Sequence, residues 1–522
     1  MASRESAWAD HHRCRGRAAP HAGPAGAPGG ACRRPAAQEC LAGGRAVQMS
    51  ALSNARWLGL AQAARIVLQI GGVLVMSRLL NPRDYGLVAM SMVVVNLAVI
   101  VRDLGTVQAV IQKKELDEET KHTAFWFACV MGSAVGAAVM LIAPWLAAGY
   151  RTPEVAGILM LLALPFPIGA SASVHQALLE RQHRFATIAR IEVSSQAIGL
   201  LVGIAAALNG FGAYSLVMQA LVAPILGTLQ MWHASPWRPR FRFSREALRG
   251  LWGFSGYLVG FQLINYFSRN ADSFIIGRML GPASLGPYTL SYRLMLFPMM
   301  NLTLVASRAL FPVMSRQQDD REAMGRLYLR VLFVIACITG PLMAGLFVLR
   351  EEFVDTVLGS KWHEVAGIVA WLAPVGFIQS LVATTGTVFM ATGRTRLMFF
   401  LGLYSATLMV SSFVIGVHWG VLGVAQAYFV ANVLNALPCL HIALRQVGLG
   451  LADLAKTLAR PLGVTVLMAV AVGLAGEPLS STLHSMLLRL VGGVLVGVAV
   501  YAVLTFVLNR TAIQELRRFV AR

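Results

Sequence analysis

Charged residues are scarce in this sequence. They make up 13% of the chain against 57% hydrophobic residues, whereas soluble domains carry roughly 25% charge. The sequence also contains no Walker A loop, no His-Glu-x-x-His motif and no Gly-x-Ser-x-Gly turn. These absences disfavour an ATP-driven pump and an enzyme with a soluble catalytic domain, and we expect neither catalytic residues nor a cofactor.

Residues that could hold a metal or form disulfides are few. The three cysteines before residue 48 lack the spacing of a zinc site, and the other three lie in apolar runs. A free thiol in such a run behaves as a small hydrophobic group. The histidines of the apolar part are scattered near the ends of these runs, so we predict no metal site and no disulfides.

Long apolar runs make up most of the chain. Each is close to the length of about 20 residues that crosses a hydrocarbon core as a helix. The runs lie at 57–80, 86–110, 123–149, 155–178, 186–208, 211–233, 250–270, 284–312, 327–349, 364–390, 397–417, 420–441, 459–475 and 484–508. The sequence therefore predicts an all-α integral membrane protein with about 14 transmembrane helices.

Residues 1–48 differ from the rest. They are rich in Ala, Gly, Pro and Arg and contain no apolar run, so they lack the core of a signal peptide. Such a segment cannot bury enough surface to fold. We predict a disordered tail, and Met49 offers an alternative start just before the first membrane run.

The net charge is +20, which in a soluble protein would favour nucleic acid as the partner. Here the basic residues gather in alternate loops, including residues 113–121, 238–245, 316–326 and 510–518. This alternation follows the positive-inside rule and places both termini in the cytoplasm. Membrane lipid, not nucleic acid, is the expected contact of this charge.

Two segments of the chain repeat each other at an offset of 200 residues. Residues 78–86 and 278–286 share an Arg, a Leu, a Pro and a Gly at matching positions, and Gln62 aligns with Gln262. Chance could produce one such match, but the ungapped register favours duplication. Because each half holds an even number of helices, both halves enter the membrane in the same orientation.

This repeat divides the chain into segments. We predict an N-terminal six-helix lobe at 49–233, a cytoplasmic linker at 234–249, a C-terminal six-helix lobe at 250–445, and two extra helices with a basic cytoplasmic tail at 446–522. Parallel repeats of this kind are typical of transporters whose substrate pathway lies between the halves. Arg78 and Arg278 are assigned to bracing the turns of the repeat.

Polar residues in the apolar runs are the candidate substrate contacts, because a charge in the membrane usually faces a cavity or a partner. The candidates are Gln62, Arg65 and Gln69 on one helix face, Gln262, Asn265 and Arg269 on the matching face of the second half, and Arg293. Snorkelling to a headgroup is the alternative for an arginine near a helix end.

Acidic residues in the runs are fewer. Asp103 follows Arg102, and Asp272 lies near Arg269. Either carboxylate could carry a coupling ion, or could neutralise the neighbouring arginine at a helix contact. The excess of intramembrane cations favours an anionic substrate, and the planar guanidinium group matches phosphate oxygens well.

Several segments together resemble a known family. The turn Arg-x-Leu-x-Pro-x-x-Tyr-Gly at 78–86 is similar to that of bacterial polysaccharide exporters, and residues 103–105, 123–126, 235–240 and 270–312 continue the likeness. The chain resembles Wzx-type lipopolysaccharide and exopolysaccharide flippases of the multidrug/oligosaccharidyl-lipid/polysaccharide superfamily. The likeness covers about residues 50 to 445.

The resemblance implies a V-shaped, two-lobed protein of the bacterial inner membrane. Such proteins move undecaprenyl-diphosphate-linked oligosaccharide between leaflets by alternating access, with the diphosphate in a cationic cavity. It also implies polysaccharide polymerase and chain-length machinery as partners. Carried onto this chain, the best cavity residues are Arg65, Arg269 and Arg293.

Three other functions are compatible with parts of the sequence. A drug/cation antiporter of the same superfamily would need acidic cavity groups, and a lipid II flippase would share the architecture. A membrane-embedded polymerase or ligase would need a large outer loop, and the predicted outer loops are short.

Overall fold

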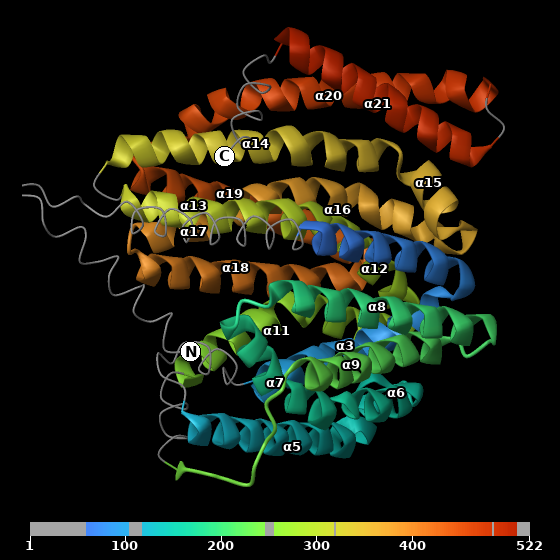
Figure 1. Ribbon diagram of the computed structural model, residues 1–522. Helices are drawn as coiled ribbons and strands as arrows, with labels where there is room; N and C mark the ends of the chain where they lie inside the picture. The colour runs from blue at the N-terminus through green and yellow to red at the C-terminus, as the bar shows by residue number, and fades with distance from the viewer. Residues whose placement is uncertain (1–58, 104–116, 246–254, 318–319, 483–484, 509–522) are drawn as a thin grey trace, which may run out of the picture. The chain divides into compact units, whose positions relative to one another are not determined.

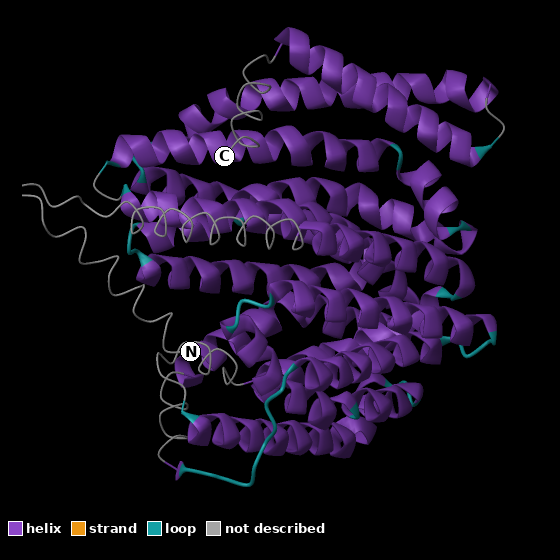
Figure 2. Ribbon diagram, viewed as in Figure 1, coloured by secondary structure: helices purple, strands orange, loops and turns teal. Residues whose placement is uncertain are grey.

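The computed structural model describes residues 59–103, 117–245, 255–317, 320–482 and 485–508, and all regular structure in these ranges is helical (Figure 2). Helices are expected because hydrocarbon offers no partners to backbone polar groups. Within these ranges, 11 stretches are long and apolar enough to span a membrane.

The predicted all-helical membrane fold is confirmed, but the predicted number of spans is not. One of the 11 stretches, Thr395–Gln446, is 52 residues long and holds two helices that the sequence analysis counted separately. The predicted tail at 1–48 lies outside the described residues.

The first half contains seven described helices, because a break near Pro165 splits one predicted span in two. They are Gly59–Leu79, α3 (Pro82–Asp103), α5 (Glu118–Tyr150), α6 (Glu154–Ala163), α7 (Pro165–Arg181), α8 (Phe185–Leu208) and α9 (Ala213–Ala234) (Figure 1). Helix α8 packs along α9, and α5 packs against α6 and α7.

The second half is built in the same way and adds short helical segments. Its elements are α11 (Ser255–Leu280), α12 (Pro282–Pro298), a π-helix at Met299–Thr303, α13 (Leu304–Arg316), α14 (Arg321–Val348), α15 (Arg350–Phe353), a π-helix at Val354–Leu358, a 3₁₀ helix at Ser360–Trp362, α16 (His363–Val382), α17 (Thr385–Ala391), α18 (Thr395–Gly416), a 3₁₀ helix at Val417–Trp419 and α19 (Gly420–Gln446). The last two helices, α20 (Leu451–Thr482) and α21 (Met486–Leu508), pack on each other, and α20 packs on α14 (Figure 1).

The repeated turn joins the two halves. Each copy opens a helix, α3 or α12, and these two helices pack extensively against each other. A Cβ atom added to Gly86 would lie 1.8 Å from the carbonyl oxygen of Pro282, and one added to Gly286 would lie 2.0 Å from that of Pro82. Only glycine permits such a close backbone approach. The contact is reciprocal, as expected of two copies related by a two-fold axis.

A buried tryptophan strengthens this contact between the halves. Trp362 has no exposed surface, donates from Nε1 to the carbonyl oxygen of Ser77 at 2.9 Å, and meets the Tyr85 ring edge-on at 5.1 Å. Arg78 donates to the carbonyl oxygens of Asp355 and Thr356. The guanidinium group therefore braces the π-helix of the other half and not its own turn.

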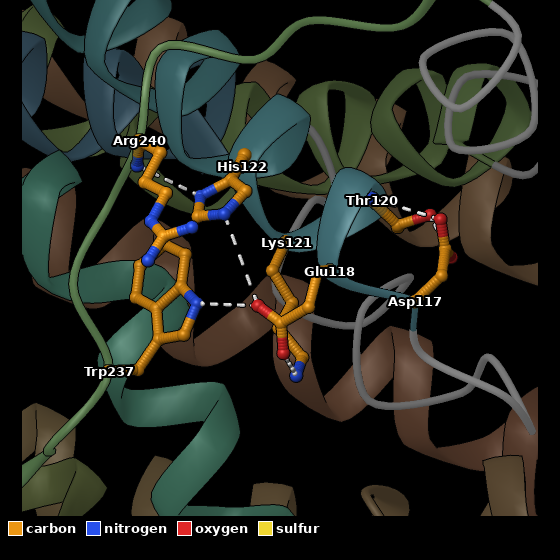
Figure 3. A network of polar contacts seen from close by, with 7 residues as sticks. All are labelled: Asp117, Glu118, Thr120, Lys121, His122, Trp237 and Arg240. Atoms are coloured by element: carbon orange, nitrogen blue, oxygen red, sulfur yellow. Dashed lines mark hydrogen bonds and ion pairs between the residues drawn. The ribbon is translucent and has the colours of Figure 1, made fainter.

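The described part of the predicted linker lies along the start of α5 (Figure 3). The backbone N–H of Arg240 donates to His122 Nδ1 at 3.0 Å, and Trp237 Nε1 donates to Glu118 Oε2 at 3.2 Å. The α5 N-terminus is itself capped by Asp117, which accepts from the Thr120 N–H. The linker is thus fixed to the first half by side chains of one helix end.

Candidate substrate cavity

A cavity of about 580 Å³ is lined by residues of both halves. Its lining residues come from the helix Gly59–Leu79, α3, α8 and α9 of the first half and from α12 of the second half. Its main polar lining residues are Gln62, Arg65, Gln69, Gln196, Gln219, Thr289 and Arg293. Four of the predicted contacts, Gln62, Arg65, Gln69 and Arg293, therefore share one cavity.

Arg65 has a partner that its position in the sequence does not reveal. Its Nη1 atom lies 2.8 Å from Glu192 Oε2 on α8, and the two side chains are 31% and 34% exposed. An ion pair with this much contact with water contributes about 0–1 kcal/mol. The Nε atom of Arg65 is buried without a hydrogen-bond partner among the described residues, so Glu192 does not satisfy the whole guanidinium group.

The remaining candidates of this cavity have looser contacts. Gln62 Nε2 lies 3.5 Å from Asn301 Oδ1 in the second half, a distance at the limit of a hydrogen bond. Gln69 and Arg293 are exposed in the cavity wall. Within the described part of the chain, Arg293 forms no ion pair, so its charge is available to a ligand.

Arg269 lies in a different place. It lines a second cavity of about 410 Å³ in the second half, together with Tyr292, Gln379 and Tyr428. Gln379 Nε2 donates to Tyr428 Oη at 2.6 Å and to Asn432 Oδ1 at 3.1 Å. The structure therefore does not bring Arg269 into the cavity that holds Arg65 and Arg293.

The coupling-ion candidates have different surroundings. Asp272 is 1% exposed and accepts hydrogen bonds from Tyr288 Oη at 2.9 Å and from the Ser273 N–H at 2.6 Å. It lines neither cavity. Asp103 ends α3, but its side chain lies outside the described residues. The side chains of Gln262 and Asn265 in α11 also lie outside the described residues.

Sequence analysis missed the polar residues of α8 and α9. Glu192 and Gln196 are four residues apart and so share a face of α8, and this spacing within an apolar run was a usable signal. The repeat does not mark this face, because α8 carries no copy of the repeated Arg-x-Leu-x-Pro turn. Gln219 is an isolated polar residue of α9 and gave no comparable signal.

The cavity is suited to an anion that carries polar groups. Two guanidinium groups are strong partners for phosphate oxygens, and four glutamine amides can bond to hydroxyl groups. No Asp or Glu side chain lines this cavity or the second one where the structure is described. The described residues also contain no cluster of three His, Cys, Asp or Glu that could hold a metal ion.

Comparison with protein families and curated sequences gives consistent matches. The family model described as polysaccharide biosynthesis protein matches residues 75–367. The chain is 26% identical to the lipopolysaccharide biosynthesis protein WzxC of Escherichia coli (strain K12), covering 76% of this chain and 81% of that protein. It is 24% identical to the succinoglycan biosynthesis transport protein ExoT of Rhizobium meliloti (strain 1021), covering 89% and 94%.

Solved structures share the fold. The lipid II flippase MurJ in an inward closed conformation superposes with a TM-score of 0.70 at 14% identity, covering 87% of this chain and 99% of MurJ. An inward-facing multidrug resistance transporter of the MATE family, of the MOP superfamily, gives 0.54 at 16% identity, covering 75% and 95%. At these identities the likeness establishes the architecture alone.

Proposed function

Because the chain belongs to the polysaccharide biosynthesis protein family and is a multi-pass membrane protein, we propose that it is a flippase for lipid-linked oligosaccharide. The substrate is undecaprenyl-diphosphate-linked oligosaccharide, which moves across the bacterial inner membrane by alternating access. The names of the relatives WzxC and ExoT support a role in surface polysaccharide biosynthesis. Polysaccharide polymerase and chain-length machinery would then act on the product.

The observation that carries this proposal is the convergence of Arg65 and Arg293, from opposite halves, on one cavity. A sugar headgroup cannot cross hydrocarbon unaided, because each hydroxyl that loses water without a new partner costs several kcal/mol. Arginine side chains offset the charge of the diphosphate, and the glutamine amides replace water around the sugar. The lipid tail can remain in the bilayer during this transfer.

The proposed orientation places both termini and the linker in the cytoplasm. Support comes from the basic segments at 113–121 and 238–245, which fall on one side under the positive-inside rule. The contact between Gly86 and Gly286 then closes the periplasmic side. Alternating access requires this contact to open and the cytoplasmic side to close. The moving bodies would be the lobes at 49–233 and 250–445, and the helices of 446–522 would move with the second lobe.

The test is export in cells that carry cavity variants in place of the deleted gene. Each lost charge-assisted hydrogen bond costs about 1.5–3 kcal/mol, so the double variant Arg65→Ala/Arg293→Ala should reduce surface polysaccharide at least tenfold. The undecaprenyl-linked oligosaccharide should accumulate in the membrane at the same time. Mass spectrometry of the lipid-linked sugars measures this accumulation directly.

The matched control is Arg83→Ala. Arg83 pairs with Glu154 at 2.7 Å, as Arg65 pairs with Glu192, but it does not line the cavity. This variant should export normally at equal abundance in the membrane. Normal export by the double cavity variant would contradict the proposal. Arg269→Ala, tested alone, shows whether the second cavity also takes part.

The rival functions predict other outcomes. A lipid II flippase would be needed for growth, so deletion of the gene would be lethal and not merely block surface polysaccharide. A drug/cation antiporter would use acidic groups to bind its substrate, and both cavities lack them in the described structure. We therefore favour the oligosaccharide substrate.

A further inference from the structure

A groove lies beside the substrate cavity. Its volume is about 910 Å³, and its walls come from the helix Gly59–Leu79, α8 and α9. Ala64 lines the groove, and its neighbour Arg65 lines the cavity. Glu192, the ion-pair partner of Arg65, lies between Ile191 and Val193, which also line the groove.

The groove is cationic. Arg184, Arg190 and His233 line it, and no acidic side chain does so among the described residues. Arg184 and Arg190 are exposed, and within the described part of the chain each donates a hydrogen bond to one backbone carbonyl, of Ala234 and Ala186 respectively. Both arginines thus retain donors and a full positive charge for an anion.

The cations form a series along α8 toward the cavity. Arg184 directly precedes the first residue of α8, and Glu192 lies farther along this helix, which rises about 1.5 Å per residue. Gln196 lies one helical turn beyond Glu192 and lines the cavity. In the proposed orientation the Arg184 end is cytoplasmic. An anion in the groove would meet Arg184 and Arg190 first, then Arg65, and finally Arg293.

Glu192 occupies the site that such an anion needs. Because both partners of the ion pair keep about a third of their side-chain surface exposed, neither charge is fully buried when they separate, and the pair is weak. A diphosphate carries more charge than a carboxylate and offers more acceptor oxygens to the guanidinium group. It can therefore replace Glu192 on Arg65 while a neighbouring arginine holds its second phosphate.

We propose that the anionic headgroup enters the cavity from this groove by displacing Glu192 from Arg65. This inference rests on the proposed function, since it assumes a diphosphate headgroup. Glu192 is then a specificity-determining counter-ion. It neutralises Arg65 when no substrate is present, and only a ligand with a stronger anionic group removes it.

Binding of undecaprenyl diphosphate to the purified full-length protein in nanodiscs tests this exchange. Glu192→Gln keeps the shape of the side chain but removes the competing charge. Since exposed pairs contribute up to about 1 kcal/mol, it should tighten binding about two- to fivefold. Glu154→Gln, which breaks the comparable pair with Arg83, should leave the affinity unchanged.

A double-mutant cycle separates counter-ion exchange from a structural effect. In an Arg65→Ala background, Glu192→Gln should no longer tighten binding, because no guanidinium group remains to be released. An unchanged or weaker affinity in the single variant, or an equal gain in the Arg65→Ala background, would overturn the proposal.

Two further ligands distinguish the possible sources of the anion. Inorganic pyrophosphate should show the same gain from Glu192→Gln, since the diphosphate itself is recognised. Phosphatidylglycerol should show a smaller gain, and an equal one would mean that the site serves ordinary anionic lipid. Failure of the wild-type protein to bind undecaprenyl diphosphate above phosphatidylglycerol would instead refute the proposed function.

The groove is tested by association kinetics. The double variant Arg184→Ala/Arg190→Ala should lower the association rate constant several-fold at low salt and leave the dissociation rate constant unchanged, because these charges steer the approach. An unchanged association rate would remove the groove from the route.

Discussion

Replacing Gly86 by alanine should weaken the contact between α3 and α12 that joins the two halves. The added Cβ would lie 1.8 Å from the carbonyl oxygen of Pro282, whereas real Cβ contacts essentially never fall below 3.0 Å. The obstacle is backbone and not the end of a flexible side chain, so rotation of a side chain cannot relieve it. One of the two helices must retreat by more than about 1 Å.

The magnitude follows from this overlap. Inserting a methyl group into a tightly packed contact costs about 1–3 kcal/mol. If the cost falls on the closed state alone, the ratio of open to closed protein rises by a factor of about 5 to 150. Alanine is also a better helix former than glycine by up to about 1 kcal/mol, and this gain is common to both states, so it does not change the ratio.

Labelling of a cavity cysteine measures the population of the open state. Gln69 lies exposed in the cavity wall. In the proposed orientation, the Gln69→Cys variant should therefore react with a membrane-impermeant maleimide only when the periplasmic side is open. In whole cells, Gly86→Ala should raise the labelling rate at least fivefold. Gly286→Ala, which meets the Pro82 carbonyl oxygen at 2.0 Å, should act in the same direction.

The control is Gly149→Ala in α5, where nothing lies within 4 Å of the new Cβ. It reproduces the change in helix propensity without the overlap, and labelling should remain at the wild-type rate. If Gly86→Ala and Gly149→Ala label Gln69→Cys alike, the reciprocal glycine contact does not hold the periplasmic side closed.

Two smaller predictions concern other parts of the fold. Trp362→Phe keeps a ring against Tyr85 but removes the 2.9 Å hydrogen bond to the Ser77 carbonyl oxygen. Loss of this bond costs the closed state about 1 kcal/mol, so the labelling rate of Gln69→Cys should rise roughly fivefold. No rise would mean that the bond is equally strong in the open and closed states. His122→Ala removes the acceptor of the Arg240 N–H hydrogen bond. In inverted vesicles, trypsin should then cleave the linker after Arg240 and Arg242 several-fold faster. An unchanged cleavage rate would show that the remaining contacts are sufficient to hold the linker.

Much of the architecture could be read from local patterns. Apolar runs of membrane-spanning length predicted helices, and the structure has a helix over each of them in its described part. The polar residues Gln62, Arg65 and Gln69 stood out because they share one helix face within such a run. The break before Pro165 follows a local rule, because proline has no backbone N–H to donate to the preceding turn. The π-helix at Val354–Leu358 gave no such pattern.

The second half of the site was harder to read. The repeat made Arg269 look equivalent to a residue of the first helix, yet the structure places it in a separate cavity. Arg293 had no aligned partner and nevertheless shares a cavity with Arg65. Repeats preserve the backbone path, but each half fills its interior with different side chains, so equivalence in sequence does not imply a shared cavity.

Hydrophobicity and residue spacing are local properties, and so the sequence by itself determined that this is a helical membrane protein with a repeated turn and polar helix faces. Which charges meet was decided only by the tertiary structure. Arg65 and Glu192 are 127 residues apart, and the reciprocal contact of Gly86 and Gly286 joins positions 200 residues apart. Such pairs form because helices pack at particular distances and rotations, and no short stretch of sequence encodes these.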